Sequence, residues 1–377
     1  MKDLARKYRP RSLSDIVGQP VVVQTLSNAI KNNSLHHAHL FVGQFGSGKT
    51  SLARILAAME NCSVSPGIKP CGKCEICKKI FNGIHTDVRE IDAASSAGSA
   101  EDIRKLKTSA RYNPVDGCKV KYYILDEIGR ASPTAGDALL KLIEEPPAGV
   151  KFVLATTEVQ KLRPAIQSRC QRHDIRKIYW GEIAERLKVV AKKEKVEVED
   201  TAINICARLA QGSMRNGLQN LEKLSDYVGD SILTGKAADE LFGSVDETLL
   251  YELFDYLIGL KSSKIDTSSG LQVINKILQT GVEFRIIYQN LVEYLRNMVV
   301  MLTASNPFEF IDVSQEGKRR LKEQCIVCQK KQKHKALFHI QSALNEAKQS
   351  VDLNMSAEHA LQSWYVRSVI VYNDSNL

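Results

Sequence analysis

Apolar residues in the first 180 positions fall into short runs that alternate with amphipathic stretches. Five or six mostly apolar residues bounded by polar turns predict strands, at 38–43, 88–92, 121–126 and 151–156, with a weaker one at 173–178. Apolar residues that recur every three or four positions predict helices, at 49–60, 100–112, 133–144 and 163–169. Strands that alternate with helices indicate an α/β fold, a parallel sheet covered by helices on both faces.

After about residue 180 the pattern becomes helical throughout. Shorter helical periods are found at 182–195, 200–210, 214–228 and 236–241. Longer ones follow at 247–260, 268–280, 283–303, 313–332, 335–350 and 357–371. No strand-like run, internal repeat or low-complexity tail is found among them. The two changes of pattern predict three domains, at 1–178, 179–242 and 243–377.

Composition narrows the class of protein. The chain has 377 residues, of which 44% are hydrophobic and 25% charged, so it is neither disordered, collagen-like nor a disulfide-rich mini-protein. No run approaches the roughly 20 apolar residues of a membrane span, and the N-terminus shows no signal-peptide pattern. Nine unevenly spaced cysteines suit a reducing compartment with a local metal site better than a disulfide framework.

The net charge of +9 is distributed unevenly along the chain. Residues 1–180 carry a net charge of +11, whereas residues 181–377 carry −2. An anionic partner, such as a nucleotide or a nucleic acid, would be attracted to the first half. An ordinary basic surface explains the charge alone equally well.

A phosphate-binding loop is the most specific motif. The pattern GxxxxGK[ST] is met by eight consecutive residues, Gly43, Gln44, Phe45, Gly46, Ser47, Gly48, Lys49 and Thr50. The motif follows a predicted strand and opens a predicted helix, which is the context it requires. Backbone N–H groups can then surround the phosphates, and the helix N-terminus adds positive potential. Lys49 is expected to reach the β- and γ-phosphates and Thr50 to bind Mg²⁺.

A second motif is the apolar strand that ends in Asp126 and Glu127. Such strand ends are common and usually form solvated turns. Beside a phosphate loop, however, Asp126 is expected to hold Mg²⁺ and Glu127 to polarise the attacking water as a general base.

Four cysteines, Cys62, Cys71, Cys74 and Cys77, lie within sixteen positions. Their spacing, with prolines and glycines between them, predicts a structural Zn²⁺ site that leaves no open position for catalysis. An iron–sulfur cluster and reduced free cysteines are the alternatives. The later pair at 325 and 328 has no second pair nearby and falls in a helical pattern, so we expect two cysteines on a helix.

Several basic residues are further candidates. Arg169 and Arg215 could neutralise charge on the transferring phosphoryl group, although most arginines are solvated surface charges. A basic helix face that follows the turn at 95–100 could contact a nucleic-acid backbone, and it comprises Arg104, Lys105, Lys107 and Arg111. An ordinary solvated face is an equally good explanation for that set.

Taken in order, these motifs resemble those of the ATPase subunit (gamma/tau) family of the bacterial DNA polymerase III clamp loader, which are AAA+ ATPases. The resemblance also rests on stretches at 4–10, 15–19, 90–95, 139–147, 152–157 and 168–170. A four-cysteine knuckle inserted after the phosphate-loop helix is distinctive among AAA+ ATPases. The resemblance is specific over residues 1–220 and only architectural beyond about 243.

The resemblance implies a RecA-like AAA+ domain with a zinc knuckle, then a helical lid and an all-helical collar that holds subunits in a ring. Tyr8, Arg9 and Val17 would lie near the adenine. Thr157 matches the polar sensor at the end of the fourth strand.

Two arginines also acquire roles by resemblance. Arg169 matches the arginine finger that reaches into the neighbouring subunit's ATP site, and Arg215 matches the second sensor in the lid. One run departs from the family, which usually has a histidine followed by two apolar residues after the acidic pair. This chain has Ile128, Gly129 and Arg130 there, which leaves the coupling role of this loop open.

The implied activity is ATP hydrolysis that opens a ring-shaped sliding clamp and loads it on primed DNA. The implied cofactors are ATP, Mg²⁺ and structural Zn²⁺. The implied partners are other clamp-loader subunits in a hetero-oligomeric ring, a pentamer in this reading, with the sliding clamp and primer–template DNA. The setting would be the cytoplasmic, nucleoid-associated replication machinery, without a membrane. The chain resembles the short form of the subunit, without the domains by which the long form meets helicase and polymerase.

Two other functions are compatible with an AAA+ motif set. A branch-migration helicase or replication initiator usually ends in a winged-helix or helix-turn-helix DNA reader, where this chain has long amphipathic helices. A non-catalytic scaffold is disfavoured by the intact Lys49, Thr50, Asp126 and Glu127. No nucleotidyl-transfer site is found, so the hydrolase would serve a polymerase assembly without polymerising DNA itself.

Overall fold

The computed structural model describes residues 3–65, 70–93, 100–115, 117–243, 245–260, 266–311, 313, 315–331 and 333–373. The chain divides into two compact units, Met1–Ala237 and Ala238–Leu377. The first unit contains the sheet and the first helices of the helical half, and the second unit is helical.

A parallel five-stranded sheet forms the centre of the first unit. Its strands are β1 (Ala38–Gly43), β2 (Val88–Asp92), β3 (Lys121–Asp126), β4 (Val150–Thr156) and β5 (Gln171–Ile175). They lie in the order β2-β3-β4-β1-β5, and every pair is parallel. The predicted parallel sheet is therefore confirmed, and β5 begins two residues earlier than expected.

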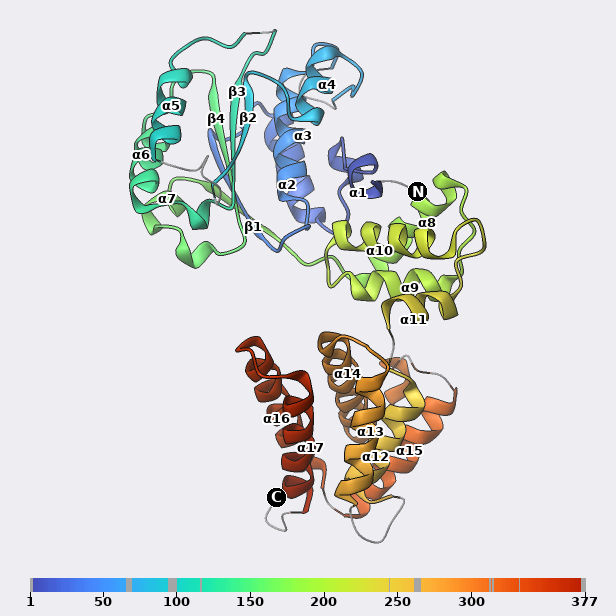
Figure 1. Cartoon of the computed structure of the whole chain (residues 1–377). Coiled ribbons are helices and arrows are strands. Elements are labelled where there is room, and N and C mark those ends of the chain that lie inside the picture. Colours follow the sequence, from blue (N-terminus) through green and yellow to red (C-terminus); the bar gives the residue numbers. More distant parts are fainter. Residues whose placement is uncertain are drawn as a thin grey trace. The chain divides into compact units, whose positions relative to one another are not determined.

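Helices cover both faces of this sheet, as predicted. On one side lie α2 (Pro20–Lys31) and α3 (Lys49–Asn61), and on the other lie α5 (Ala100–Ala110) and α6 (Pro133–Glu144) (Figure 1). Because successive side chains of a strand point to opposite faces, β3 contributes to the apolar cores on both sides of the sheet. Tyr122 and Ile124 pack with the α3 side, and Tyr123 and Leu125 with the α6 side. Because both faces are buried, the inner strands are mostly apolar, whereas the edge strands β2 and β5 carry more polar residues.

Three α-helices were not predicted. They are α1 (Leu4–Lys7), α2 and α4 (Glu75–Asn82). The start of α2 does carry a sequence signal, because Pro20 occupies its first turn, where the missing N–H costs nothing. The α4 helix follows Cys74, whose sulfur accepts the N–H of Cys77, so its start depends on the cysteine cluster.

The remaining helices match the predicted periods to within two residues at each end. In the first unit or at its end they are α7 (Pro164–Gln167), α8 (Trp180–Glu194), α9 (Asp200–Leu209), α10 (Met214–Val228) and α11 (Gly235–Phe242). In the second unit they are α12 (Glu247–Ile258), α13 (Thr267–Gln279), α14 (Phe284–Thr303), α15 (Gln315–Lys330), α16 (His334–Asp352) and α17 (Ala357–Asn373). No described helix is long and apolar enough to cross a membrane.

The second unit has its own apolar core. Its largest fully buried side chains include Phe254 on α12 and Trp364, Tyr365 and Tyr372 on α17. The two cysteines at 325 and 328 are buried on α15, as expected of helix core residues.

A buried asparagine joins the end of α3 to the start of β3. Asn61 is 1% exposed, and its amide nitrogen donates to the carbonyl oxygens of Ala57 and Val120. Its amide oxygen accepts the N–H groups of Lys119 and Val120. All four hydrogen-bonding positions of the side chain are therefore used by backbone groups.

Replacing Asn61 with alanine should therefore destabilise the first unit more than a surface change would. Two backbone N–H groups and a carbonyl would lose their partners, and each buried unsatisfied group costs about 1–3 kcal/mol. Chemical denaturation should show a loss of at least about 2 kcal/mol. The control is Asn32→Ala, at an exposed position with an ordinary negative φ, and equal stabilities of the two variants would contradict the assignment.

Candidate nucleotide-binding site

The phosphate loop connects β1 to α3. Gly46 and Gly48 adopt left-handed backbone angles, with φ of 76° and 105°. A Cβ atom on Gly46 would also lie 2.0 Å from the hydroxyl oxygen of Ser213. Glycine is thus required at position 46 by backbone angle and by space, and at position 48 by backbone angle, since residues with a side chain rarely adopt such angles.

Lys49 is the buried cation of this loop. Its side chain is 5% exposed, and Nζ donates to the carbonyl oxygens of Gly43 at 2.8 Å and Gln44 at 3.0 Å. Burial lowers the pKa of Lys49, while the nearby carboxylates of Glu127 and Asp126 act in the opposite direction. The ammonium is held inside the loop, where it can exchange carbonyl partners for phosphate oxygens.

The two predicted Mg²⁺ ligands lie together. The hydroxyl of Thr50 donates to Oδ2 of Asp126 at 2.7 Å, although the residues are 76 positions apart. The contact arises because Thr50 begins α3 and Asp126 ends β3, and both face the carboxyl edge of the sheet. A hydroxyl and a carboxylate are oxygen ligands of the kind that Mg²⁺ prefers.

Glu127 is held by the end of the neighbouring strand. Its Oε2 accepts the hydroxyl of Thr157 at 2.9 Å and the Thr157 N–H at 3.3 Å. Its Oε1 lies 4.0 Å from Nζ of Lys49. Glu127 itself has a left-handed φ of 50°, which is uncommon for a residue with a side chain. The carboxylate is therefore fixed between the phosphate loop and β4.

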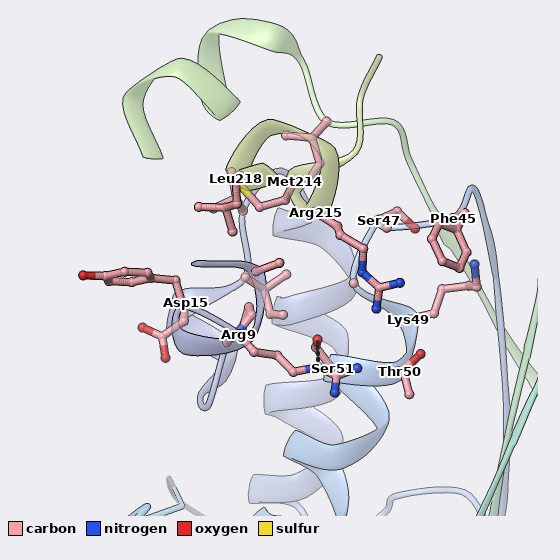
Figure 2. Close-up of a pocket in the computed structure, with 18 of the residues that line it drawn as sticks. Arg9, Asp15, Phe45, Ser47, Lys49, Thr50, Ser51, Met214, Arg215 and Leu218 are labelled. Atoms are coloured by element: carbon pink, nitrogen blue, oxygen red, sulfur yellow. Dashed lines mark hydrogen bonds between the residues drawn. The ribbon is translucent and has the colours of Figure 1, made fainter. Parts of the chain in front are cut away.

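The other walls of the pocket come from the N-terminal segment and from α10. Ser213 caps α10 by accepting the N–H of Asn216, which places Arg215 in the first turn. Figure 2 shows the Arg215 side chain directed toward Lys49 and Phe45, and its guanidinium carbon lies 4.7 Å from the centre of the Phe45 ring. Tyr8, Arg9 and Val17 also line this pocket.

Arg9 and Tyr8 are anchored differently. Nε of Arg9 donates to the hydroxyl of Ser51 at 3.3 Å (Figure 2), and burial, followed by the nearby Arg54, lowers the pKa of Arg9. The Tyr8 hydroxyl donates to the carboxylate of Glu194 on α8, and burial with this bond raises the pKa of Tyr8 to about 12. The N-terminal segment is thus bonded both to the helix after the phosphate loop and to α8.

The pocket contains most of the predicted ATP-site residues. Three other predicted residues do not line the pocket but bond directly to Lys49 or Glu127, and they are Gly43, Gln44 and Thr157. Residues that the sequence analysis missed also line it, and they include Asp15, Ile16, Ser51, Glu90, Ile178, Arg186, Met214 and Leu218. Asp15, Ile16 and Glu90 lie in stretches that carry the family resemblance, but the sequence analysis assigned them no role. Arg186 and Leu218 have no local motif, and the fold brings them to the phosphate loop.

Arg169 lies outside this pocket. Its Nη2 pairs with Oε1 of Glu144 at 2.9 Å, and its Nη1 donates to the carbonyl oxygen of Ala165. It lines a separate surface hollow that also contains His36 and His37. The structure thus does not place Arg169 beside the phosphate loop of its own chain.

The predicted basic helix face is carried by α5. Lys107 is exposed there, and Lys105 pairs with Glu101 at 3.1 Å. Arg111 is exposed one residue beyond the end of the helix. The side chain of Arg104 and residues 95–99 of the preceding turn lie outside the described part of the chain. The α5 face lies on the opposite side of the sheet from α3.

Four cysteine sulfurs converge at the end of α3. The sulfurs of Cys62, Cys71, Cys74 and Cys77 all lie within 4.8 Å of one another. Backbone N–H groups of residues 65, 71, 74 and 77 donate to three of them at 3.3–3.4 Å. Burial disfavours the Cys62 thiolate, but these N–H donors lower the pKa of Cys62 to about 6. Converging thiolates with N–H donors fit a tetrahedral Zn²⁺ ion.

A second cluster contains His85, Asp87 and Cys118. The N–H of Asp87 donates to Nδ1 of His85 at 3.1 Å, so the neutral ring carries its proton on Nε2. Nε2 lies 3.4 Å from the Cys118 sulfur and donates its hydrogen to that sulfur. In this state Nε2 offers no lone pair to a metal ion. We therefore expect no metal at this cluster.

This chain departs from the usual family sequence at residues 128–130, and the structure explains why residue 129 is a glycine. A Cβ atom on Gly129 would lie 2.7 Å from the hydroxyl oxygen of Thr156 and 2.9 Å from the carbonyl oxygen of Glu158. The short 3₁₀ turn η3 (Ile128–Arg130) therefore packs directly on the end of β4. This turn follows Glu127, and the strand end leads to Thr157.

A parallel sheet with a phosphate loop after β1, an acidic pair after β3 and a helical lid after β5 defines an AAA+ ATPase domain. Family models agree along the chain: "DNA polymerase III, delta subunit" matches residues 18–179, and "DNA polymerase III clamp loader subunit, ATPase lid domain" matches residues 182–221. "DNA polymerase III subunits gamma and tau domain III" matches residues 233–362. The chain belongs to the gamma/tau subunit family of DNA polymerase III.

Individual relatives cover different shares. DNA polymerase III subunit gamma of Buchnera aphidicola subsp. Acyrthosiphon pisum is 36% identical over 80% of this chain and 81% of that protein. DNA polymerase III subunit tau of Bacillus subtilis is 37% identical over 80% of this chain but only 52% of that protein. The chain thus spans about half the length of that tau relative, and 36% of the tau/gamma subunit of Haemophilus influenzae. Among solved structures, the Thermotoga maritima RuvB Holliday junction branch migration motor is similar at 21% identity, with a TM-score of 0.48, over 73% of this chain and 86% of that one.

Proposed function

We propose that this chain binds and hydrolyses ATP in the pocket between the phosphate loop, the N-terminal segment and α10. The observation that carries the proposal is the pair of contacts Thr50–Asp126 and Thr157–Glu127 on either side of Lys49. Residues from three strand ends thereby form one constellation with a cation, a set of oxygen ligands and a candidate base.

Each group has a role that follows from its chemistry. Lys49 and Arg215 neutralise phosphate charge, and Glu127 accepts a proton from the attacking water while Thr157 holds its carboxylate in position. Thr50 and Asp126 would hold Mg²⁺, which supplies charge neutralisation on the phosphate oxygens. Tyr8, Arg9 and Val17 would face the adenine end of the nucleotide.

We further propose that ATP turnover drives loading of a sliding clamp on primed DNA. The proposal rests on membership of the gamma/tau family and on the order of domains, with 1–178 as the ATPase, 179–242 as the lid and 243–377 as the collar. Other clamp-loader subunits in a ring, with five members, the clamp and primer–template DNA would be the partners. The cytoplasm, at the replication machinery, would be the location.

The test is ATP turnover by the chain assembled with its partner subunits. Addition of clamp and primed DNA together should accelerate turnover above either component alone, and the mass of the assembly gives the number of subunits. Acceleration by four-way junction DNA without a clamp would instead support a branch-migration function and overturn clamp loading.

We propose that the four-cysteine cluster holds a structural Zn²⁺ ion. Freshly purified protein should contain one zinc per chain by elemental analysis. Cys74→Ser should lose the metal, whereas Cys118→Ser, in the neighbouring hydrogen-bonded cluster, should keep it. Zinc contributes on the order of 10 kcal/mol to isolated fingers, but less is at stake on a domain with its own core.

ATP turnover should therefore largely survive slow removal of zinc by a chelator. An iron chromophore, or a second zinc that disappears with Cys118→Ser, would contradict the assignment of the cluster.

A further inference from the structure

The second unit carries a surface of phenylalanine rings surrounded by cations, which we call the Phe–Lys surface. It consists of Arg296 on α14, Phe308 and Phe310 in and after the 3₁₀ turn η5 (Pro307–Glu309), and Lys318 and Lys322 on α15. The nitrogens of Lys318 and Lys322 lie 5.6 and 5.0 Å from the centre of the Phe308 ring. The two lysines are four positions apart, so they share one face of α15.

This surface stands out against the charge of the rest of the unit. Residues 315–335 contain eight Lys or Arg and two Glu, whereas residues 181–377 as a whole have a net charge of −2. Arg319 is ion-paired with Glu316 and Glu323, so its charge is partly compensated. Among the described side chains, no carboxylate lies within ion-pair distance of Lys318 or Lys322. Their charges remain available to an anionic ligand.

The second phenylalanine is largely solvent-exposed. Phe310 is 59% exposed, although a phenylalanine usually gains from burial. Both terminal nitrogens of Arg296 lie 3.5 Å from the Phe310 carbonyl oxygen, so a third cation borders the same turn. The exposed Phe310 thus has Arg296 at its backbone, and Phe308, which contacts the two lysines, lies two residues before it. Together they offer a stacking platform and phosphate-binding charge.

We propose that the Phe–Lys surface binds single-stranded nucleic acid. The lysines and Arg296 contact backbone phosphates, and Phe310 stacks on an unpaired base. This combination of stacking aromatic and cationic groove is how single strands are bound without sequence preference. A duplex would present phosphates but no free base face, and an acidic peptide would leave the ring without a stacking partner. The function goes beyond ATP hydrolysis and requires no nucleotide.

The test is fluorescence anisotropy of a labelled oligothymidine strand titrated with the full chain. A chain with Lys107→Gln and Arg111→Gln serves as the background, so that the exposed α5 face does not mask the effect. Phe310→Ala should weaken binding by about 5- to 140-fold, the range for one base–aromatic stack. Lys318→Gln with Lys322→Gln should reduce the slope of log affinity against log salt by about 1.4, from two lost contacts on a single strand.

The matched control is Lys348→Gln. Lys348 also lies over an aromatic ring, 5.6 Å from the centre of Tyr288, but on α16 and away from the basic segment. It should leave affinity and salt slope unchanged. Equal effects of Lys348→Gln and the lysine pair, or an affinity for duplex or polyglutamate as high as for the single strand, would overturn the proposal. ATP turnover of the same variants is measured separately, so failure here does not depend on the proposed hydrolysis.

Discussion

Glu127→Gln is expected to retain ATP binding while its turnover falls about 10²- to 10⁴-fold, the usual contribution of a general base. The amide keeps the size of the side chain and can still bond to Thr157, but it cannot accept a proton from water. Single-turnover hydrolysis and equilibrium binding of a fluorescent ATP analogue separate the two effects.

Lys49→Ala should impair ATP binding, the step that precedes hydrolysis. Its buried ammonium would no longer compensate phosphate charge, and a charged hydrogen bond of this kind is worth about 1.5–3 kcal/mol. Nucleotide affinity should therefore fall by at least about 10-fold. Glu158→Gln is the control for Glu127→Gln, because the Glu158 carboxylate also lies just after a strand, β4, but pairs with Lys161 rather than lining the pocket. Wild-type turnover by Glu127→Gln would show that another group is the base.

Arg169→Ala is expected to remove stimulated turnover in the assembled complex while ATP binding by the isolated chain stays nearly intact. Arg169 lies on a separate hollow, paired with Glu144, so it has no contact with its own nucleotide pocket to lose. A guanidinium supplied to a neighbouring γ-phosphate is worth roughly 10³–10⁵ in rate where such fingers operate. Arg172→Ala, which removes an exposed arginine paired with Asp174, should be silent.

Mixed assemblies distinguish action on a neighbour from action on the same chain. Chains with Arg169→Ala keep Lys49, and chains with Lys49→Ala keep the arginine. An interface between the two can therefore contain one complete site, and partial recovery of turnover is expected. If verified mixed assemblies show none, Arg169 serves its own chain or only the fold.

Strands and long helices could be predicted because their burial leaves a direct mark on the sequence. The run at 121–126 is apolar at its four middle positions since both faces of β3 are covered, and its limits coincide with the observed strand. Short elements lack such a mark. The four residues of α1 complete barely one helical turn, and α4 follows from how the cysteines converge rather than from its own periodicity.

Some residues of the candidate site could likewise be predicted from the local sequence, and others could not. Lys49 and Thr50 belong to a contiguous motif, so their chemistry was readable from local sequence. The link from Thr157 to Glu127 was not, because it depends on β4 lying between β1 and β3 in the sheet. Resemblance to the family pointed to Thr157, whereas Arg186 in the pocket had neither a motif nor a family pattern to indicate it.

The close packing at Gly129 limits which segments can be exchanged between relatives. No side chain larger than hydrogen has space at this position beside Thr156 and Glu158. In a chimaera that received only the family's usual histidine-containing run, a side chain at position 129 would push the turn away from the end of β4. Glu127, which precedes the turn, would then separate from Thr157. The turn after β3 and the exit of β4 therefore form one inherited unit, and a working transplant must carry both segments together.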